Sequence, residues 1–385
     1  MGKSPNLKVL EFPIGASPKE RGRIRGETMK PFIIEEIENW KYLHILESPN
    51  LDFDEFINQF INDTKYIEAV KKWTPHLLEE VVGISEGSGI DFNTIFCGSC
   101  VDEISVPERG LGVSKPLQGT QTKTSGCTTL GCFKEKGNPA LLGQNLDTIE
   151  SFKNNAVLLD LKEDNGHKSY ILTFPEAIGA IGLNNSPLGV VVNSIYKKSS
   201  KDGLPVQFIL RKILEQSHLN DAIKFLKNVK HAAAHNYMLG DSEKIVNFEC
   251  SANKISQFFP YDGARRLYHT NHALVNDDVI PKYKLPKDIK KNSMDRFKYL
   301  EFRLKDPSKT ITIENIKQIL SSHIGPICQH GVSKTKVFGK RFVSLTLIPD
   351  SGCTGASVIY KLSKPPELYI ALGNPCTNEY ECFTF

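Results

Sequence analysis

The stretch "TKTSGCTTLGCF" at residues 122–133 marks a change in the character of the chain. Residues 106–126 are rich in Gly, Pro, Ser and Thr and have no apolar face, which predicts an exposed connector. After Cys127 come short apolar or alternating runs separated by turn residues, a pattern typical of β-strands. The sequence therefore predicts that a sheet-rich region begins at Cys127.

The chain before the connector has mainly helical periodicity. Apolar residues recur every three or four positions in 31–46, 51–73 and 75–89, which predicts two or three helices. Helical patterns return later in the chain, between runs of predicted strands. They cover residues 206–216, 219–229, 291–304 and 313–322. Runs of strands alternating with helix pairs favour an α+β fold, in which helices cover antiparallel sheets, over a strictly alternating parallel fold.

The composition excludes several classes of protein. Lys and Arg number 48 against 44 Asp and Glu, and the basic residues are scattered, so we expect no nucleic-acid partner. No apolar run reaches the length of a signal peptide or a membrane span, so we expect a cytoplasmic protein with no membrane association. Nine cysteines without a secretion signal predict mostly reduced thiols.

Cys127 is the candidate nucleophile, although a buried cysteine can equally fill space in a core. A thiol nucleophile needs a base, and no papain-like signature surrounds Cys127. If the bond between Gly126 and Cys127 breaks, the freed α-amine of Cys127 can serve, because its ordinary pKa is about 7.7 to 8.0. Gly126 has no side chain to block attack of the sulfur on its carbonyl group.

Several motifs, in order along the chain, resemble those of the penicillin acyltransferase-like family of N-terminal nucleophile hydrolases. "GCTT" at 126–129 and "GQNLD" at 143–147 are the most specific pair, and "HTNH" at 269–272 and "GNPC" at 373–376 add support. The resemblance runs over nearly the whole chain. Precursors of this family cut themselves before a cysteine and then use that cysteine as the nucleophile.

The resemblance implies a four-layer αββα sandwich, with two antiparallel sheets between layers of helices. Residues 1–126 would form a helical α-chain or propeptide-like segment. Residues 127–385 would form the β-chain that carries the nucleophile. Both parts would belong to one αββα domain, and the two self-cleaved chains would stay associated.

The resemblance also implies roles for individual residues. Gly126 and Cys127 would flank the self-cleaved bond, and Cys127 would be the nucleophile. Asp147 matches a family aspartate that orients the new ammonium group. Asn271 matches the oxyanion-hole asparagine. Asn193 is a candidate for a second contact to the oxyanion or the substrate.

One position departs from the family pattern. Related proteins often carry an arginine after "IC", where this chain has Gln329. A missing guanidinium removes a bidentate clamp on a carboxylate, so Gln329 is a candidate oxyanion or substrate contact of altered strength. Arg341 or Arg25 could supply the missing charge.

The predicted function is that of an autoprocessed amidohydrolase or N-acyltransferase acting on a small acyl amide or thioester. We expect no required cofactor, although a coenzyme A thioester could be the acyl donor. No metal site is predicted, because neither "HTNH" nor "CGSC" at 97–100 has a complete set of ligands. Two alternatives stay open: a non-cleaving protein that binds an acylated ligand, and a papain-like hydrolase that pairs Cys127 with a histidine such as His323.

Overall fold

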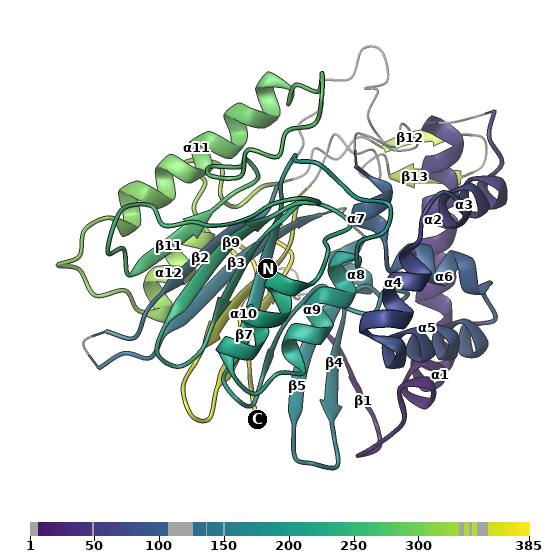
Figure 1. The fold of residues 1–385 in the computed structure, drawn as a ribbon, viewed down its shortest axis with the longest axis horizontal. Helices are drawn as coiled ribbons and strands as arrows, with labels where there is room; N and C mark the ends of the chain where they lie inside the picture. The colour runs from purple at the N-terminus through teal and green to yellow at the C-terminus, as the bar shows by residue number, and fades with distance from the viewer. Residues whose placement is uncertain are drawn as a thin grey trace.

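Two stacked sheets form the centre of the molecule in a computed structural model of the chain (Figure 1). The structure describes residues 7–47, 50–106, 126–135, 137–148, 151–330, 335–338, 341–344 and 353–385. Most of the strands lie after Cys127, as the sequence predicts. No helix in these described ranges is long and apolar enough to cross a membrane.

The first sheet has eight described strands in the order β1-β4-β5-β6-β7-β8-β9-β10. They are β1 Lys8–Glu11, β4 Val157–Lys162, β5 Lys168–Thr173, β6 Ile181–Asn184, β7 Gly189–Ser194, β8 His235–Gly240, β9 Ile245–Cys250 and β10 Ile255–Gln257. Every pair is antiparallel except β1 with β4, which is parallel. The sequence does not predict the edge strand β1, because the chain before the connector shows mainly helical periodicity.

The second sheet has six described strands in the order β11-β2-β3-β14-β15-β16, all antiparallel. They are β2 Thr128–Cys132, β3 Leu141–Thr148, β11 Arg266–His269, β14 Cys353–Lys361, β15 Glu367–Leu372 and β16 Glu381–Thr384. A separate hairpin joins β12 Thr335–Phe338 to β13 Arg341–Ser344. Cys127 therefore directly precedes β2, an inner strand of this sheet.

Helices cover the outer face of each sheet, so the predicted α+β class and four-layer order are confirmed. Helices α9 (Val206–Leu214) and α10 (Leu219–Asn228) pack on the first sheet. Helices α11 (Lys287–Leu304) and α12 (Ile313–Leu320) pack on the second. Between the sheets lies a core of aliphatic side chains from both inner faces. A short helix, α8 (Phe152–Asn155), precedes β4.

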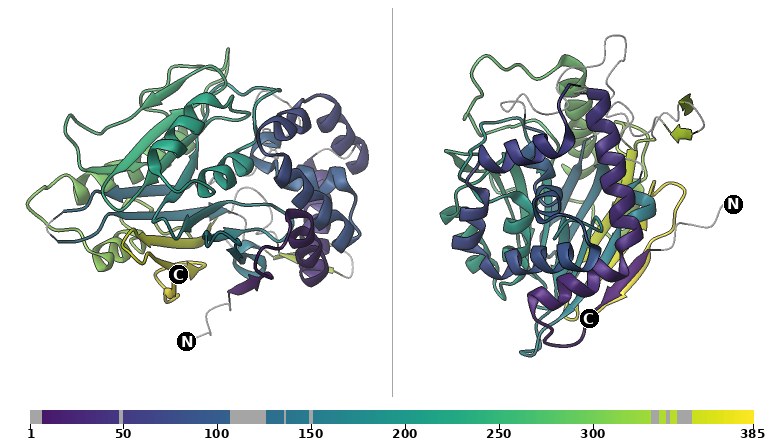
Figure 2. Two further views of the ribbon diagram at one scale, coloured as in Figure 1. Left: turned by 60° about the horizontal axis from the view of Figure 1, so that its bottom comes forward. Right: turned by 90° about the vertical axis from the view of Figure 1, so that its right-hand side faces the viewer.

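The N-terminal helices lie across one end of the sheets (Figure 2, right). They are α1 Pro18–Thr28, α2 Lys30–Glu47, α3 Phe53–Asn62, α4 Tyr66–Trp73, α5 Pro75–Ser88, α6 Phe92–Gly98 and α7 Val101–Ile104. The prediction of two or three helices is too low for this described region. Asp52 and Asp91 explain part of the difference, because their side chains accept backbone N–H groups and begin α3 and α6.

A buried ion pair links the N-terminal helices to the layer over the first sheet. Arg211 of α9 donates from Nη1 to Oε1 of Glu80 on α5 at 2.8 Å, and from Nη2 to Oε2 at 2.7 Å. The two side chains are 3% and 2% exposed. Because both charges are desolvated, each depends on the other, and the pair joins residues on opposite sides of Cys127 in the sequence.

We expect Arg211→Met to destabilise the protein by about 3–5 kcal/mol, because it leaves the Glu80 carboxylate buried without its bidentate partner. The control is Lys19→Met, which breaks an exposed pair with Glu86 and should leave stability almost unchanged. Urea unfolding followed by circular dichroism measures both. Equal effects of the two substitutions would contradict the structural role of the Arg211–Glu80 pair.

Candidate active site

Strand register brings Gly126, Cys127 and Asp147 together. In the antiparallel pair of β2 and β3, Thr128 lies opposite Asn145. Continuing that register by two residues places Gly126 opposite Asp147. Gly126 is buried, whereas Cys127 keeps part of its surface exposed. The two most specific sequence motifs therefore meet at the ends of neighbouring strands.

The Asp147 carboxyl group accepts hydrogen bonds from three directions. Thr354 Oγ1 donates to Oδ1 at 2.7 Å, and Gln329 Nε2 donates to Oδ2 at 2.9 Å. The backbone N–H of Gly126 donates to the same carboxyl group. Desolvation outweighs these bonds and the nearby charge of Arg296, and raises the pKa of Asp147 to about 7. Near neutral pH, Asp147 can therefore both accept and hold a proton.

Gln329 thus contacts Asp147, and the structure does not offer it as a separate contact to an oxyanion. Its backbone N–H donates to Thr354 Oγ1 at 3.0 Å, and its carbonyl oxygen accepts from the backbone N–H of Thr354 at 2.9 Å. The segment after α12 is therefore fastened to β14 beside Asp147. A neutral amide occupies the place where the resemblance leads one to expect a guanidinium.

A guanidinium does reach the site, but from α11. Arg296 is 1% exposed, and its Nη1 donates to the carbonyl oxygen of Cys127 at 2.7 Å and to Thr128 Oγ1 at 3.0 Å. Its Nη2 donates to Asn271 Oδ1 at 3.0 Å, and its Nε to Asn292 Oδ1 at 2.9 Å. The sequence analysis missed this residue.

Neither arginine that the sequence analysis suggests as a replacement is seen in this role. Arg25 is buried on α1, where it donates to the carbonyl oxygens of Phe174, Pro175 and Ala177 in the connection between β5 and β6. Its Nη1 also lies 4.0 Å from Oε1 of Glu80. The side chain of Arg341 lies outside the described residues.

Asn271, which follows β11, lies against the residue before Cys127. A Cβ atom placed on Gly126 would be 2.2 Å from Asn271 Oδ1 and 2.9 Å from Arg296 Nη2. A larger residue at this position would therefore clash with Asn271 and Arg296 unless these side chains moved. The side-chain amide of Asn271 donates to the carbonyl oxygen of Ser194 at 3.0 Å, which anchors it to the end of β7.

Asn193 comes from the other sheet and reaches the same residue. Its Nδ2 donates to the carbonyl oxygen of Cys127 at 2.9 Å, and its Oδ1 accepts from Thr129 Oγ1 at 2.7 Å. Asn193 is completely buried in β7. Two amide side chains and one guanidinium therefore surround the backbone at Gly126 and Cys127.

The thiol of Cys127 is hard to ionise in the intact chain. Desolvation and the neighbouring Asp147 carboxylate raise its pKa to about 12, although the backbone N–H of Asp147 and the charge of Arg296 oppose the shift. The thiol is therefore protonated at neutral pH and needs a base before it can attack a carbonyl group. Asp147 is the carboxyl group next to it.

His323, the candidate base of the papain-like alternative, lies in a different group of side chains. Its Nε2 is 3.1 Å from Nε2 of His330. The histidines of "HTNH" also have partners of their own. His269 Nε2 lies 2.8 Å from Glu249 Oε1, and His272 Nδ1 lies 2.8 Å from Ser293 Oγ.

Comparison with known proteins identifies relatives of this chain. A protein from Emericella nidulans named acyl-coenzyme A:6-aminopenicillanic-acid-acyltransferase 40 kDa form is 26% identical over 211 residues, which are 54% of this chain and 55% of the relative. A β-alanyl-dopamine/carcinine hydrolase from Drosophila melanogaster is 25% identical over 229 residues, 56% of this chain and 55% of the relative. The chain thus spans about half the length of the curated relatives it matches.

Solved structures with some similarity include an amidase and a hydrolase by name. A Caenorhabditis elegans ortholog of N-acylethanolamine-hydrolyzing acid amidase has a TM-score of 0.43 and 15% identity, covering 61% of this chain and 93% of its own. A conjugated bile acid hydrolase from Clostridium perfringens has a TM-score of 0.42 and 16% identity, covering 67% and 97%.

The family comparison confirms the resemblance seen in the sequence. The family model described as acyl-coenzyme A:6-aminopenicillanic acid acyl-transferase matches residues 133–347, more than half of the chain. The matched region begins after Cys127 and includes Asp147, Asn271 and Arg296. The chain belongs to the acyl-coenzyme A:6-aminopenicillanic acid acyl-transferase family.

Proposed function

We propose that this protein cuts itself between Gly126 and Cys127 and then hydrolyses, or transfers, the acyl group of a small amide or thioester. The observation that carries the proposal is the convergence of Asp147, Asn271 and Arg296 on the Gly126–Cys127 segment. A carboxyl group that titrates near neutrality lies beside the thiol, and polar side chains surround the bond to be cut. Family membership supports the same class of reaction.

Self-cleavage would begin when the Asp147 carboxylate takes the proton from the Cys127 thiol. The sulfur then attacks the carbonyl carbon of Gly126, and the proton passes to the departing nitrogen of Cys127. This exchange of an amide for a thioester frees the α-amine. Water hydrolyses the thioester, leaving a carboxylate on Gly126 and the thiol on Cys127.

Substrate turnover would then use the amine and the thiol of the same residue. The α-amine takes the thiol proton, and the sulfur attacks the acyl carbon of the substrate. The leaving group, an amine from an amide or a thiol from a thioester, receives that proton, and an acyl-enzyme remains. Water completes hydrolysis, whereas a second amine completes acyl transfer. The Asp147 carboxylate beside the new ammonium group favours its charged form and fixes its orientation.

The side-chain amides of Asn271 and Asn193 are the proposed stabilisers of the oxyanion. One N–H of Asn193 donates to the carbonyl oxygen of Cys127, and one N–H of Asn271 donates to that of Ser194. The second N–H of each NH₂ group would therefore be the donor to charge that develops on an attacked carbonyl oxygen. Removal of one such donor costs about 2.7 to 4 kcal/mol of transition-state stabilisation in a comparable site. Arg296 would hold Asn271 in position through its Oδ1 atom.

The names of the relatives suggest a class of substrate. One is named for acyl transfer from coenzyme A to an amine, and the other for hydrolysis of β-alanyl-dopamine and carcinine. We therefore propose a small acylated amine or a coenzyme A thioester as the acyl source, with no cofactor required. Residues 1–126 and 127–385 would remain associated after cleavage, held in part by the Arg211–Glu80 pair.

Purified protein should consist of two chains that meet at Gly126 and Cys127, and Cys127→Ala should leave one intact chain. The reason is that alanine has no atom that can attack the Gly126 carbonyl group. Intact-mass spectrometry measures both. Cys132→Ala is the matched control and should still be cleaved, because it changes a buried cysteine at the other end of β2.

Other outcomes of this mass measurement separate the alternatives. An uncut, inert chain that binds an acylated ligand would favour the binding protein. An uncut chain whose amidase activity is lost in His323→Ala would favour the papain-like hydrolase. Either outcome would contradict the proposal.

The rate of self-cleavage should rise with pH around a midpoint of about 7, because the thiol proton needs an ionised Asp147. Thr354→Val should move the midpoint to higher pH, since the Thr354 hydroxyl lowers the pKa of Asp147. Precursor refolded from denaturant and sampled over time by gel electrophoresis gives the rates. A flat profile across neutral pH, or cleavage of Asp147→Asn at the normal rate, would rule out Asp147 as the base.

Arg296→Met should slow self-cleavage and destabilise the protein by about 3–5 kcal/mol, because it strips several buried acceptors of their donor. It should also raise the midpoint of the pH profile, since the charge of Arg296 lowers the pKa of Asp147. Lys298→Met, an exposed position on the same helix, is the control for both measurements. An unchanged pH midpoint in Arg296→Met would show that the guanidinium does not act on Asp147.

A further inference from the structure

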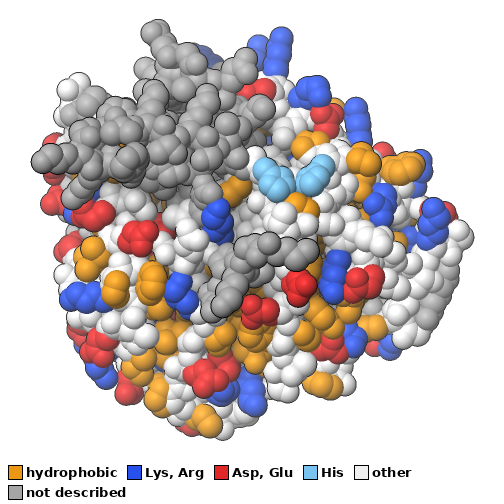
Figure 3. All heavy atoms as spheres, turned by 180° about the vertical axis from the view of Figure 1, so that it is seen from behind, with side chains coloured by type: hydrophobic (Ala, Val, Ile, Leu, Met, Phe, Trp, Pro, Cys, Tyr) orange, Lys and Arg blue, Asp and Glu red, His pale blue; other side chains and the backbone are white. Residues whose placement is uncertain are grey.

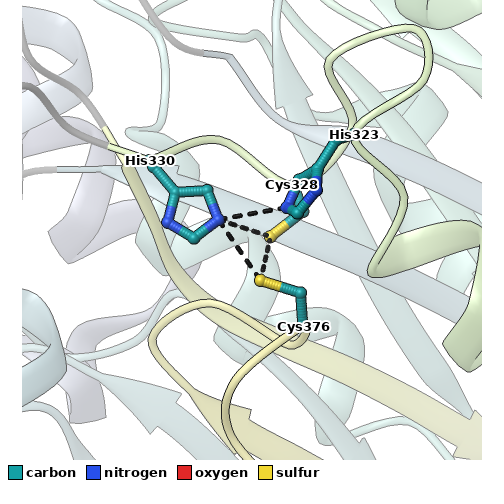
Figure 4. A group of neighbouring side chains, drawn as sticks. All are labelled: His323, Cys328, His330 and Cys376. Atoms are coloured by element: carbon teal, nitrogen blue, oxygen red, sulfur yellow. Dashed lines mark hydrogen bonds between the residues drawn. The ribbon is translucent and has the colours of Figure 1, made fainter.

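Four side chains from two separate loops converge next to Gln329, the residue that donates to Asp147 (Figure 4). His323, Cys328 and His330 lie in the segment after α12, and Cys376 lies in the loop after β15. His323 and His330 are exposed, whereas Cys328 is buried. Figure 3 shows histidine side chains gathered at the surface of the molecule as seen from behind.

The ligand atoms of this cluster face one another. The Nε2 atoms of His323 and His330 are 3.1 Å apart, and the Sγ atoms of Cys328 and Cys376 are 3.6 Å apart. His330 Nε2 lies 3.2 Å from Cys376 Sγ and 3.9 Å from Cys328 Sγ. All four atoms lie within 4.8 Å of one another.

These separations match a tetrahedral metal site. Zinc bonds of about 2.3 Å to sulfur and about 2.0–2.1 Å to nitrogen put two sulfurs about 3.8 Å apart and two nitrogens about 3.3 Å apart. A sulfur and a nitrogen would be about 3.6 Å apart in the same geometry. The four separations given above agree with these values within about 0.4 Å. The two remaining separations, from His323 to the sulfur atoms, lie within 4.8 Å, so one ion fits between the side chains once His323 moves closer.

The backbone around the cluster is fixed by other contacts. The backbone N–H of Cys328 donates to the carbonyl oxygen of Ser322 at 2.9 Å. Asn374 Nδ2 donates to the carbonyl oxygen of Gln329 at 2.6 Å and lies 3.4 Å from Cys328 Sγ, which joins the two loops. These contacts fix the backbone at Cys328 and Gln329 and hold the two loops that carry the ligands side by side.

A disulfide between Cys328 and Cys376 is the simplest competing explanation. A disulfide bond is about 2.05 Å long, much shorter than the 3.6 Å between these sulfurs. A disulfide would also leave unexplained why two imidazole nitrogens point at the same place. Two thiolates and two neutral imidazoles, in contrast, form a complete set of zinc ligands whose two negative charges balance the ion.

We propose that His323, Cys328, His330 and Cys376 bind a structural zinc ion. Binding releases the two thiol protons to solvent, and the four protein ligands leave no open position for catalysis. This proposal replaces the expectation from the sequence that the chain has no metal site. The sequence hides the ligands because Cys376 is distant from the other three residues, and the short spacing of Cys328 and His330 matches no common zinc motif.

The ion would hold the loop that supports Asp147. Gln329 lies between two of the ligands and donates to Asp147 Oδ2, and its backbone is bonded to Thr354, which donates to Asp147 Oδ1. Zinc would thus fix both side-chain donors of this carboxyl group. This consequence for Asp147 rests on the proposed function, whereas the zinc site itself does not.

The test is the metal content of the protein, which is purified without chelators and then dialysed. Plasma mass spectrometry should find about one zinc ion per protein molecule, cleaved or not, and Cys376→Ser and His330→Ala should lose most of it. The matched control is Cys382→Ser, which removes an exposed cysteine outside the cluster and should keep the zinc. The wild-type protein stripped of zinc and titrated with cobalt(II) should show the intense visible bands of tetrahedral thiolate coordination.

The cobalt titration uses the wild-type protein, so it tests the site even if a variant does not fold. No zinc together with no tetrahedral cobalt spectrum would overturn the proposal, as would a Cys328–Cys376 disulfide in freshly purified protein. Zinc retained at the normal level in folded Cys376→Ser would also overturn it. Neither readout depends on chain cleavage or acyl transfer, so failure of the zinc site and failure of the proposed function are distinguishable.

Discussion

The buried guanidinium of Arg296 is the constraint on which the rest of the site depends. Its N–H groups join the carbonyl oxygen of Cys127 at the start of β2 to Asn271 after β11 and to Asn292 on its own helix. A buried cation must be paired with acceptors, so these elements can pack only in one relative position. That position places Gly126 against Asn271, where a Cβ atom would clash with the Asn271 side chain. The geometry at the proposed cleavage point follows from this packing.

Asp147 carries the charge opposite to that of Arg296, and opposing effects set its pKa. Desolvation alone would keep it protonated, whereas Arg296, Thr354 and Gln329 favour the carboxylate, and the resulting pKa of about 7 lies where a proton carrier is useful. The supports of Asp147 come from β14 and from the loop that carries the proposed zinc ligands. A structural ion there would make the position of the Asp147 carboxyl group depend on the two loops that carry the ligands.

The sequence predicts what depends on local pattern. Strand alternation after Cys127 and the helical periodicities predict antiparallel sheets covered by helices. The four-layer order and the place of Asp147 beside Cys127 come from the family resemblance, and the pairing of β2 with β3 brings the two motifs together. Arg296 escapes prediction because, within the basic helix α11, it is indistinguishable from a solvated residue until the helix packs on the sheet. Strand β1 is too short to show a period and is defined by pairing with β4, far along the chain. The cluster around Cys376 is likewise a product of tertiary contact.

The central claim is that an amine and a thiol on the same residue perform the chemistry. The most direct test is reaction of the mature protein with a cyanobenzothiazole reagent, which condenses only with a residue that carries both groups, followed by peptide mass spectrometry. The account predicts a label on Cys127, loss of acyl-transfer or amidase activity in proportion to labelling, and no label in uncleaved Asp147→Asn. Active protein whose Cys127 remains unlabelled and joined to Gly126 would contradict it.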